Sequence, residues 1–170
     1  HVMMVAENGR VIGAIGKGFV RLSAAVARID APVCVAEGPE TGLTIWAATG
    51  YEVIIALGGL RRSADFELRG RRVVICRDDD LRGSEAIKAA KAAMVALQSK
   101  GVDVKIATPF EVRRCNKSDF NDLAQEEGLE AVKARIDLVA LDSPAIAQRL
   151  VSIDDARQRI DARVGEFFDA

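Results

Sequence analysis

Short apolar-rich runs alternate with stretches of helical spacing between residues 33 and 136. The apolar-rich runs fall at residues 33–36, 53–57, 72–76 and 102–107. Short runs in which neighbouring positions are both apolar are typical of strands that are buried on both faces. The alternation of such strands with helices predicts an α/β fold, in which a mainly parallel sheet is flanked by helices.

The clearest helix starts after Ser84, a good N-cap residue, and ends near Gly101. Its expected inner stripe consists of Ile87, Ala90, Met94 and Leu97. Farther along the chain, a short helix is predicted to start near Phe120 or Asn121, and another helix to follow Gly128.

An earlier helix is predicted over residues 40–49, because this stretch follows a strand and ends at Gly50. Its apolar positions are expected to share one inner face, formed by Leu43, Trp46 and Ala47. This helix would connect the first two predicted strands as part of a βαβ unit.

The two ends of the chain differ from this central pattern. Residues 1–30 hold short apolar runs between glycines, which predicts a small β element that belongs partly to an upstream region. After Ser152 helical spacing predicts a C-terminal helix with an apolar face, formed by Ile153, Ala156, Ile160, Val164 and Phe167. We therefore expect a lead-in (1–30), a catalytic domain (31–140) and a helical extension (141–170), together forming a piece of a longer protein.

Composition narrows the class of protein. The chain has 170 residues, of which 49% are apolar and 29% charged, the balance of a soluble globular domain. It contains no apolar run near the ~20 residues that cross a bilayer and no signal-peptide pattern, which predicts a cytoplasmic protein with no membrane partner. The net charge of −1 means that any nucleic-acid binding must be local.

Several kinds of catalysis are excluded by the residues available. His1 is the sole histidine, which leaves no Ser-His-Asp triad, Cys-His pair or histidine zinc site. The three cysteines are widely spaced and read as small buried hydrophobic residues: Cys34, Cys76 and Cys115. Tyr51 is the sole tyrosine and stands at the start of a core strand, where a packed aromatic ring is expected.

Acidic residues follow two of the predicted strands. Glu37 comes directly after the first strand, and Asp78, Asp79 and Asp80 follow the third. Parallel sheets bind ligands at the carboxyl ends of their strands, so these side chains are expected at one edge. Asp78 and Asp80 alternate in register and point the same way, whereas Asp79 points elsewhere. Converging carboxylates suit Mg²⁺ or Mn²⁺, although aspartates at such turns are also common as caps.

Three motifs in this order resemble the Toprim domain. They are AEGPETGL at residues 36–43, DDDLRG at residues 78–83 and KSDFNDL at residues 117–123. The resemblance extends over residues 32–136 and is closest to the primase-like Toprim proteins of phages, plasmids and conjugative elements. Residues 16–22 are also similar to the lead-in that precedes the domain in such proteins.

The resemblance implies a compact four-stranded Toprim core and a set of functional residues. It implies that Glu37 acts in acid/base catalysis or at the metal, and that Asp78 and Asp80 bind Mg²⁺ or Mn²⁺. Further residues match recurrent positions that support the site or a second ion, with local helix capping as the alternative: Glu40, Asp119, Asn121 and Asp122.

The sequence departs from the usual pattern at two positions. Arg77 stands where a small residue is usual, and it is expected either to contact phosphate or to pair with an aspartate and weaken metal binding. Pro39 replaces an aliphatic residue. Contacts with nucleic acid or phosphate are expected from Arg77, Lys117, Arg113 and Arg114.

The resemblance implies a DNA primase-like nucleotidyltransferase that uses nucleotides and single-stranded DNA. A nuclease or topoisomerase-type strand cleavage by the same carboxylates is the first alternative. A non-catalytic module that docks a helicase or relaxase in a replication or mobilisation protein is the second.

Overall fold

The computed structural model describes residues 4–5, 11–12, 18–25, 31–57, 59–80, 84–112 and 117–141. The chain divides into two compact units, His1–Ala140 and Leu141–Ala170, and the fold described below is that of the first unit. The predicted C-terminal helix after Ser152, together with Arg113, Arg114 and Cys115, lies outside the described residues. The predicted domain boundaries stay predictions.

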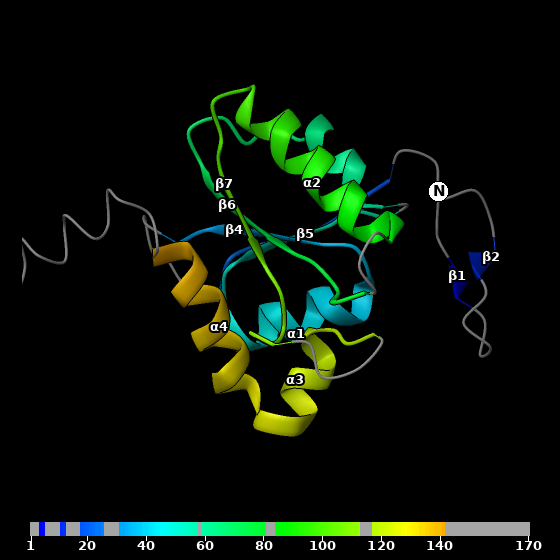
Figure 1. The fold of residues 1–170 in the computed structure, drawn as a ribbon, viewed down its shortest axis with the longest axis vertical. Helices are drawn as coiled ribbons and strands as arrows, with labels where there is room; N and C mark the ends of the chain where they lie inside the picture. The colour runs from blue at the N-terminus through cyan, green and yellow to red at the C-terminus, as the bar shows by residue number, and fades with distance from the viewer. Residues whose placement is uncertain are drawn as a thin grey trace, which may run out of the picture. The chain divides into compact units, whose positions relative to one another are not determined.

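A five-stranded sheet forms the centre of the domain, in the order β3-β5-β4-β6-β7 (Figure 1). The four predicted strands are parallel and correspond to β4 (Val33–Ala36), β5 (Glu52–Ile55), β6 (Arg72–Cys76) and β7 (Asp103–Ala107). A fifth strand, β3 (Val20–Leu22), pairs antiparallel with β5 at one edge. The predicted α/β fold is therefore confirmed, with one edge strand more than the four-stranded core that the resemblance implied.

The region predicted as an N-terminal β element supplies this edge strand and a separate pair of strands. β1 (Met4–Val5) and β2 (Val11–Ile12) pair antiparallel with each other in a two-stranded sheet of their own. The edge strand β3 continues the main sheet, because Val20 pairs with Ile55 at the carboxyl end of β5.

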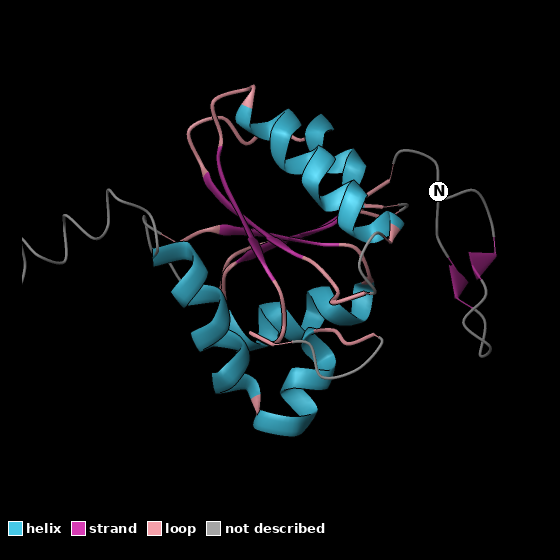
Figure 2. Ribbon diagram, viewed as in Figure 1, coloured by secondary structure: helices cyan, strands magenta, loops and turns pink. Residues whose placement is uncertain are grey.

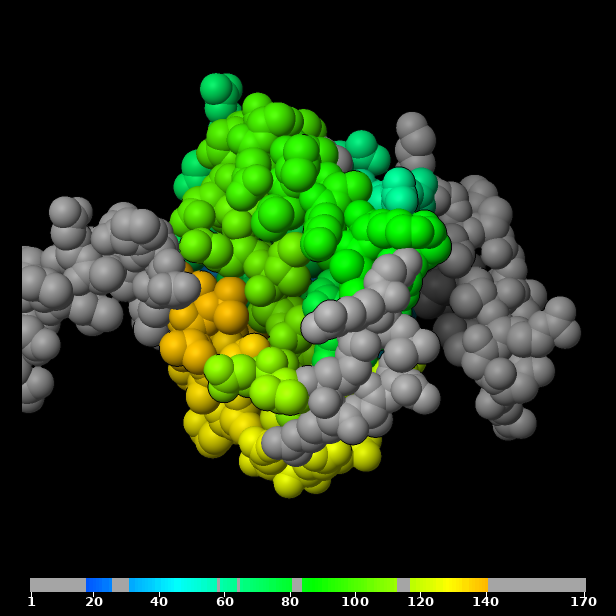
Figure 3. Space-filling model, in the orientation of Figure 1, coloured from blue at the N-terminus to red at the C-terminus, as the bar shows by residue number. Residues whose placement is uncertain are grey.

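Helices cover both faces of the sheet (Figure 2). In the space-filling view, the green surface of α2 and the yellow and orange surfaces of α3 and α4 lie in opposite halves of the picture (Figure 3). One face is covered by α1 (Pro39–Thr49), α3 (Phe120–Glu127) and α4 (Leu129–Leu141). The other is covered by α2 (Glu85–Gln98) and a 3₁₀ helix, η1 (Leu60–Asp65). The strands are accordingly buried on both sides, as their continuous apolarity predicted.

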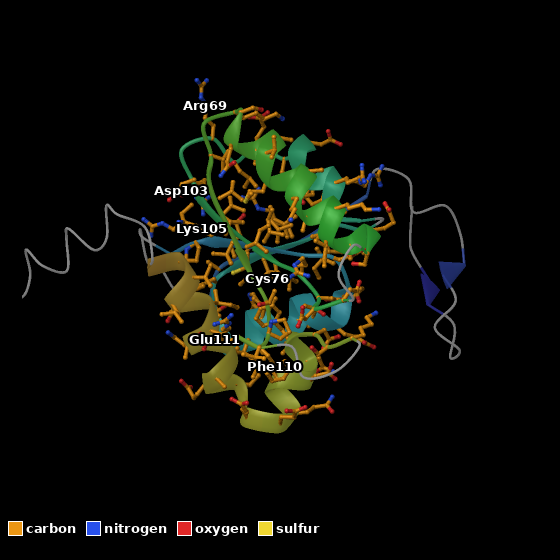
Figure 4. All side chains as sticks on the ribbon, in the orientation of Figure 1. Arg69, Cys76, Asp103, Lys105, Phe110 and Glu111 are labelled. Carbon is orange, nitrogen blue, oxygen red and sulfur yellow. The ribbon has the colours of Figure 1, made fainter. Side chains whose placement is uncertain are left out.

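Alternate side chains of each strand enter two different cores. In β4, Cys34 and Ala36 face α1, α3 and α4, whereas Val33 and Val35 face α2 and η1. Cys34 and Cys76 are both fully buried, which confirms that they serve as small hydrophobic residues. In Figure 4, β7 runs from Asp103 past Lys105 toward Phe110, close to the region where Cys76 ends β6.

The helix predicted from Ser84 is confirmed in its start and in part of its inner face, since the predicted Ile87 is only half-buried and Ala93 takes a buried position instead. The Ser84 hydroxyl accepts a hydrogen bond from the backbone N–H of Ile87 at 3.3 Å and caps α2. Ala90, Ala93 and Leu97 are the buried residues of this helix, and Met94 packs against the same core. The helices predicted near Phe120 and after Gly128 are also present, as α3 and α4.

The predicted inner face of α1 is wrong. Leu43 and Trp46 are 52% and 37% exposed, and Ala47 is exposed as well. The buried residues are instead Thr41, Gly42, Ile45 and Thr49. Gly42 explains the difference, because a Cβ at this position would lie 2.5 Å from Cγ1 of Ile55. The helix turns its glycine toward β5 and approaches the sheet closely there, which leaves larger apolar side chains outside.

Tyr51 is 2% exposed, which confirms the expected packed aromatic ring. Its hydroxyl donates a hydrogen bond to Oδ1 of Asp137 at 2.6 Å, and Lys133 pairs with the other carboxylate oxygen of Asp137. This network attaches α4 to the sheet at the amino end of β5. Within the described part of the chain, no helix is long and apolar enough to span a membrane.

Candidate functional site

The connections that follow β4 and β6 lead to opposite sides of the sheet. After β4 it crosses through α1 on one face to β5, and after β6 it crosses through α2 on the opposite face to β7. β4 and β6 are neighbours, so their carboxyl ends border a switch point, the usual ligand-binding position of such sheets. Glu37 directly follows β4, and Asp78 to Asp80 follow β6 after Arg77.

The pKa of Asp78 reports on the charged groups at the carboxyl ends of these strands. Burial, followed by the charge of Asp119, raises the pKa of Asp78 from its ordinary value of 3.8 to about 6. Lys117 lowers the pKa of Asp78, whereas Glu37 and Asp80 raise it further. Glu37 and Asp80, the other two carboxylates predicted from the sequence, therefore each act on Asp78 at this edge, as does Asp119.

The burial of the three aspartates follows the expected alternation. Asp78 and Asp80 are half-buried, whereas Asp79 is only 6% exposed. Glu37 is exposed at the turn that leads into α1. The backbone N–H of Asp79 donates to the carbonyl of Ser118 at 2.7 Å, which joins the segment after β6 to the segment before α3.

Asp119 has a capping role that the sequence offered as an alternative to a role at the site. Its Oδ1 accepts hydrogen bonds from the backbone N–H groups of Asn121 and Asp122, at 2.8 and 2.9 Å. The Asp122 carboxylate in turn accepts from the backbone N–H of Asp119 at 2.9 Å, which completes a capping box. Capping does not remove Asp119 from the site, because its charge is the strongest carboxylate influence on Asp78.

Asn121 connects α3 to α1. The Thr44 hydroxyl donates a hydrogen bond to Oδ1 of Asn121 at 3.2 Å. Glu40, which lies one helical turn before Thr44, is exposed in the first turn of α1. The bond between Thr44 and Asn121 therefore ties together the two helices whose first turns border the carboxylates.

The basic residues predicted for phosphate contact have different positions. Nζ of Lys117 lies 4.0 Å from Oδ2 of Asp78, and the Lys117 side chain is 69% exposed. Nη2 of Arg77 lies 3.9 Å from Oδ1 of Asp79, and both of these side chains are largely buried. Arg77 thus pairs with an aspartate, as one of the two expectations held. Its partner is the inward Asp79 rather than a predicted metal ligand.

Gly59 lies beside the site and was not singled out from the sequence. A Cβ built on Gly59 would be 3.9 Å from Oε1 of Glu37, and the residue has a φ of 108°, which L side chains rarely adopt. The signal in the sequence is the Gly58-Gly59 pair at the end of β5. The backbone conformation, rather than lack of space, is what requires glycine here, because a Cβ at 3.9 Å from Glu37 would make an ordinary van der Waals contact.

Helix starts surround the carboxylates. α1 starts two residues after Glu37, and α3 starts directly after Asp119. The N-terminus of a helix carries a partial positive charge and exposed N–H donors, which favour carboxylates and phosphates. At α3 the N–H groups of Asn121 and Asp122 already donate to Asp119, whereas α1 has no side-chain cap, so the start of α1 is the part of this edge that is suited to phosphate.

The chemistry of these side chains fits a divalent cation. Carboxylate oxygens are the ligands that Mg²⁺ and Mn²⁺ prefer, and several carboxylates near Asp78 need a cation or a proton to limit their repulsion. Among the described residues, no three acidic, histidine or cysteine side chains converge closely enough to surround one ion. The metal assignment therefore stays a prediction.

Comparison with protein families matches residues 32–130 to the Toprim domain. Comparisons with curated proteins and with solved structures found no match. Toprim domains occur in primases, nucleases and topoisomerases, where they take part in metal-dependent processing of nucleic acids and in general bind Mg²⁺. Because the match covers more than half of the 170 residues and includes the sheet edge that carries the carboxylates, the chain belongs to the Toprim domain family.

Proposed function

We propose that this chain is the Toprim part of a DNA primase that synthesises primers on single-stranded DNA with Mg²⁺ or Mn²⁺. The observation that carries the proposal is the group of carboxylates around Asp78, which lies at the switch point of the sheet beside the starts of α1 and α3. The primase assignment, and the origin in a phage, plasmid or other mobile element, rest on the resemblance of residues 117–123 and 16–22 to the primase-like branch.

Asp78 and Asp80 would hold the cation, and Glu37 would serve either as a further ligand or as the general base. When bound, a divalent cation neutralises the phosphates of an incoming nucleotide and stabilises the leaving pyrophosphate. Glu37 is exposed at the edge, where its carboxylate would accept the proton of the attacking 3′-hydroxyl. Lys117, close to Asp78, would contact a phosphate of the nucleotide or template.

The template strand would meet basic groups near this edge. Arg62 lies at the carboxyl end of β5, where its Nη1 donates to the carbonyl of Leu57 at 3.3 Å. Arg61, the preceding residue of η1, has a side chain that is 61% exposed. Contacts of this kind bind the phosphate backbone without reading sequence, and the resulting affinity depends on salt.

A role in contacts with other domains is a second candidate function. The exposed Leu43 and Trp46 favour it, because they form an apolar stripe on the surface of α1. The partner would be another domain of a longer replication or mobilisation protein, such as a helicase or relaxase. Topoisomerase chemistry is disfavoured, because the hydroxyl of Tyr51 is buried and bonded to Asp137.

Nucleotide incorporation by the parent protein tests the proposal. We expect incorporation of labelled nucleotide on a single-stranded template with Mg²⁺ or Mn²⁺, and loss of that activity in Glu37→Gln. Glutamine keeps the size of the side chain but cannot take the proton. Glu67→Gln, at an exposed position away from the carboxylates, is the matched control. Cleavage that requires Glu37 and the cation, without incorporation on any template, would replace the primase assignment with a nuclease.

A further inference from the structure

The side chain of Arg77 contacts the segment of three aspartates, residues 78–80, on its buried side. Its Nη1 donates a hydrogen bond to the carbonyl oxygen of Asp78 at 3.0 Å, and its Nη2 lies 3.9 Å from Oδ1 of Asp79. The side chains of Arg77 and Asp79 are only 14% and 9% exposed. A single guanidinium therefore contacts the backbone of one aspartate and the carboxylate of the next.

The backbone of the same segment is also fixed at two points. The N–H of Arg77 donates to the carbonyl of Ala107 at 2.9 Å, and the N–H of Asp79 donates to the carbonyl of Ser118 at 2.7 Å. With Asp79 turned inward, an extended segment presents its neighbours Asp78 and Asp80 on the opposite side. The inward pair therefore determines where the two outward carboxylates point.

Because both side chains are largely buried, the charges of Arg77 and Asp79 depend on each other for compensation. A carboxylate that is largely removed from water is costly unless a cation or hydrogen bonds compensate for it. Arginine suits this position, because its planar fork contacts two acceptors at once, whereas the ammonium group of lysine acts as a point charge.

The pairing also directs the positive charge of Arg77 away from the outward carboxylates. Its guanidinium has two partners in this segment, the backbone carbonyl of Asp78 and the carboxylate of Asp79, and neither partner is the carboxylate of Asp78 or Asp80. Asp79 therefore keeps an adjacent arginine from neutralising a place where a cation would bind.

We propose that Arg77 and Asp79 form a buried clamp that positions Asp78 and Asp80 for a divalent cation and withholds the arginine charge from them. The clamp rests on the cation site of the proposed function. It assigns a positioning role to Asp79 and gives Arg77 a role other than contact with phosphate.

Titration of the 170-residue chain with Mn²⁺ by calorimetry, together with thermal melts of the metal-free protein, tests the clamp. Asp79→Asn should lower the Mn²⁺ affinity at least tenfold, because it releases the guanidinium toward Asp78 and Asp80. Arg77→Lys keeps the charge but not the two-point contact, and should lower the affinity by about threefold to tenfold. This second variant keeps the test decisive if Asp79→Asn does not fold.

Matched controls come from the amino ends of β6 and β7, away from the carboxylates. Arg72 and Asp103 form an ion pair at 3.5 Å, so Arg72→Lys and Asp103→Asn change the same residue types away from the carboxylates. Both controls should bind Mn²⁺ within about twofold of the unmodified chain. Equal losses in controls and clamp variants, or no loss in folded clamp variants, would overturn the clamp alone. An unmodified chain that does not bind Mn²⁺ would overturn both the clamp and the cation site of the proposed function.

Discussion

The parallel strands begin at one end of the sheet, called here the amino edge, and finish at the other, the carboxyl edge. At the amino edge acidic side chains pair with arginines, whereas at the carboxyl edge carboxylates gather around Asp78. Glu52, the first residue of β5, lies 2.6 Å from Nη2 of Arg21 and 3.3 Å from Nη2 of Arg71. The first contact is an ion pair without hydrogen-bond geometry, and the second is a hydrogen bond. Arg72 and Asp103, the first residues of β6 and β7, form a further pair.

At the carboxyl edge, Asp78 interacts with three carboxylates and one lysine. Such an arrangement is unfavourable without a ligand, because the carboxylates repel one another and part of their charge is buried. The charges of the amino edge therefore compensate one another within the fold, whereas those of the carboxyl edge repel one another in the absence of a cation, as the proposed metal site would require. Changing an acid to its amide at each edge should therefore have opposite effects.

The largest expected difference between the edges is in cation binding. Asp78→Asn or Asp80→Asn should lower the affinity for Mg²⁺ at least tenfold, which corresponds to about 1.4 kcal/mol or more, because each removes a charged ligand. Glu52→Gln at the amino edge should leave the affinity unchanged. Calorimetric titration of the three variants checks this. Unchanged affinity in both aspartate variants would remove the metal assignment.

The amino edge should lose stability when its acid is neutralised. Glu52→Gln should lower the free energy of unfolding by about 1–2 kcal/mol, because a carboxylate that is 12% exposed no longer compensates Arg21 and Arg71. Urea denaturation measures the change. Glu67→Gln, at an exposed position, is the control and should stay within about 0.5 kcal/mol of the unmodified chain. Equal stability of Glu52→Gln and the control would mean that these ion pairs do not hold the edge strand.

The carboxyl edge should gain stability when Asp78 is neutralised in the absence of metal. The pKa of Asp78 is raised to about 6 in the folded state, so between pH 4 and pH 6 the folded state holds more protons than the unfolded state. Stability therefore falls as pH rises through this window. Asp78→Asn avoids that loss and should be more stable by about 1 kcal/mol at pH 7, a value reduced for solvent screening.

Thermal melts of metal-free Asp78→Asn and unmodified protein at pH 4 and pH 7 check the sign. The two proteins should converge at pH 4, where Asp78 is largely protonated in the folded state. A variant that is less stable than the unmodified chain at pH 7 would show that Asp78 contributes favourable interactions to the metal-free fold, against the contrast between the edges.

Local signals in the sequence were sufficient for most of the fold. The apolar runs stop shortly before Glu37 and Asp78, which predicted where β4 and β6 end. Ser84 predicted the start of α2, because its side chain caps the helix. The register of the sheet places the first two together, because β4 and β6 pair in parallel. Alternation along the chain also predicted that Asp79 points away from the direction of Asp78 and Asp80, and the structure shows that Asp79 is the buried one of the three.

Long-range packing decided what the sequence did not show. α1 is apolar on more than one side, so its pattern did not distinguish Leu43 from Ile45, and the close approach of Gly42 to Ile55 fixed its rotation. The proximity of Asp119 to Asp78 likewise depends on the bond from Asp79 to Ser118, which joins segments far apart in the sequence.

The smallest expected effect concerns a hydrogen bond that joins two helices at the carboxyl edge. Thr44→Val removes the hydroxyl that donates to Asn121, and should lower the free energy of unfolding by about 0.5–1 kcal/mol because the bond is only partly buried. Thr44→Ser keeps the hydroxyl and should recover most of the loss, as measured by urea denaturation of both variants. Since α1 follows Glu37 and α3 follows Asp119, Thr44→Val should also weaken Mg²⁺ binding about twofold to threefold, whereas Glu52→Gln should not. Equal stability of the valine and serine variants would mean that packing, rather than this bond, holds the two helices together at the edge where the carboxylates lie.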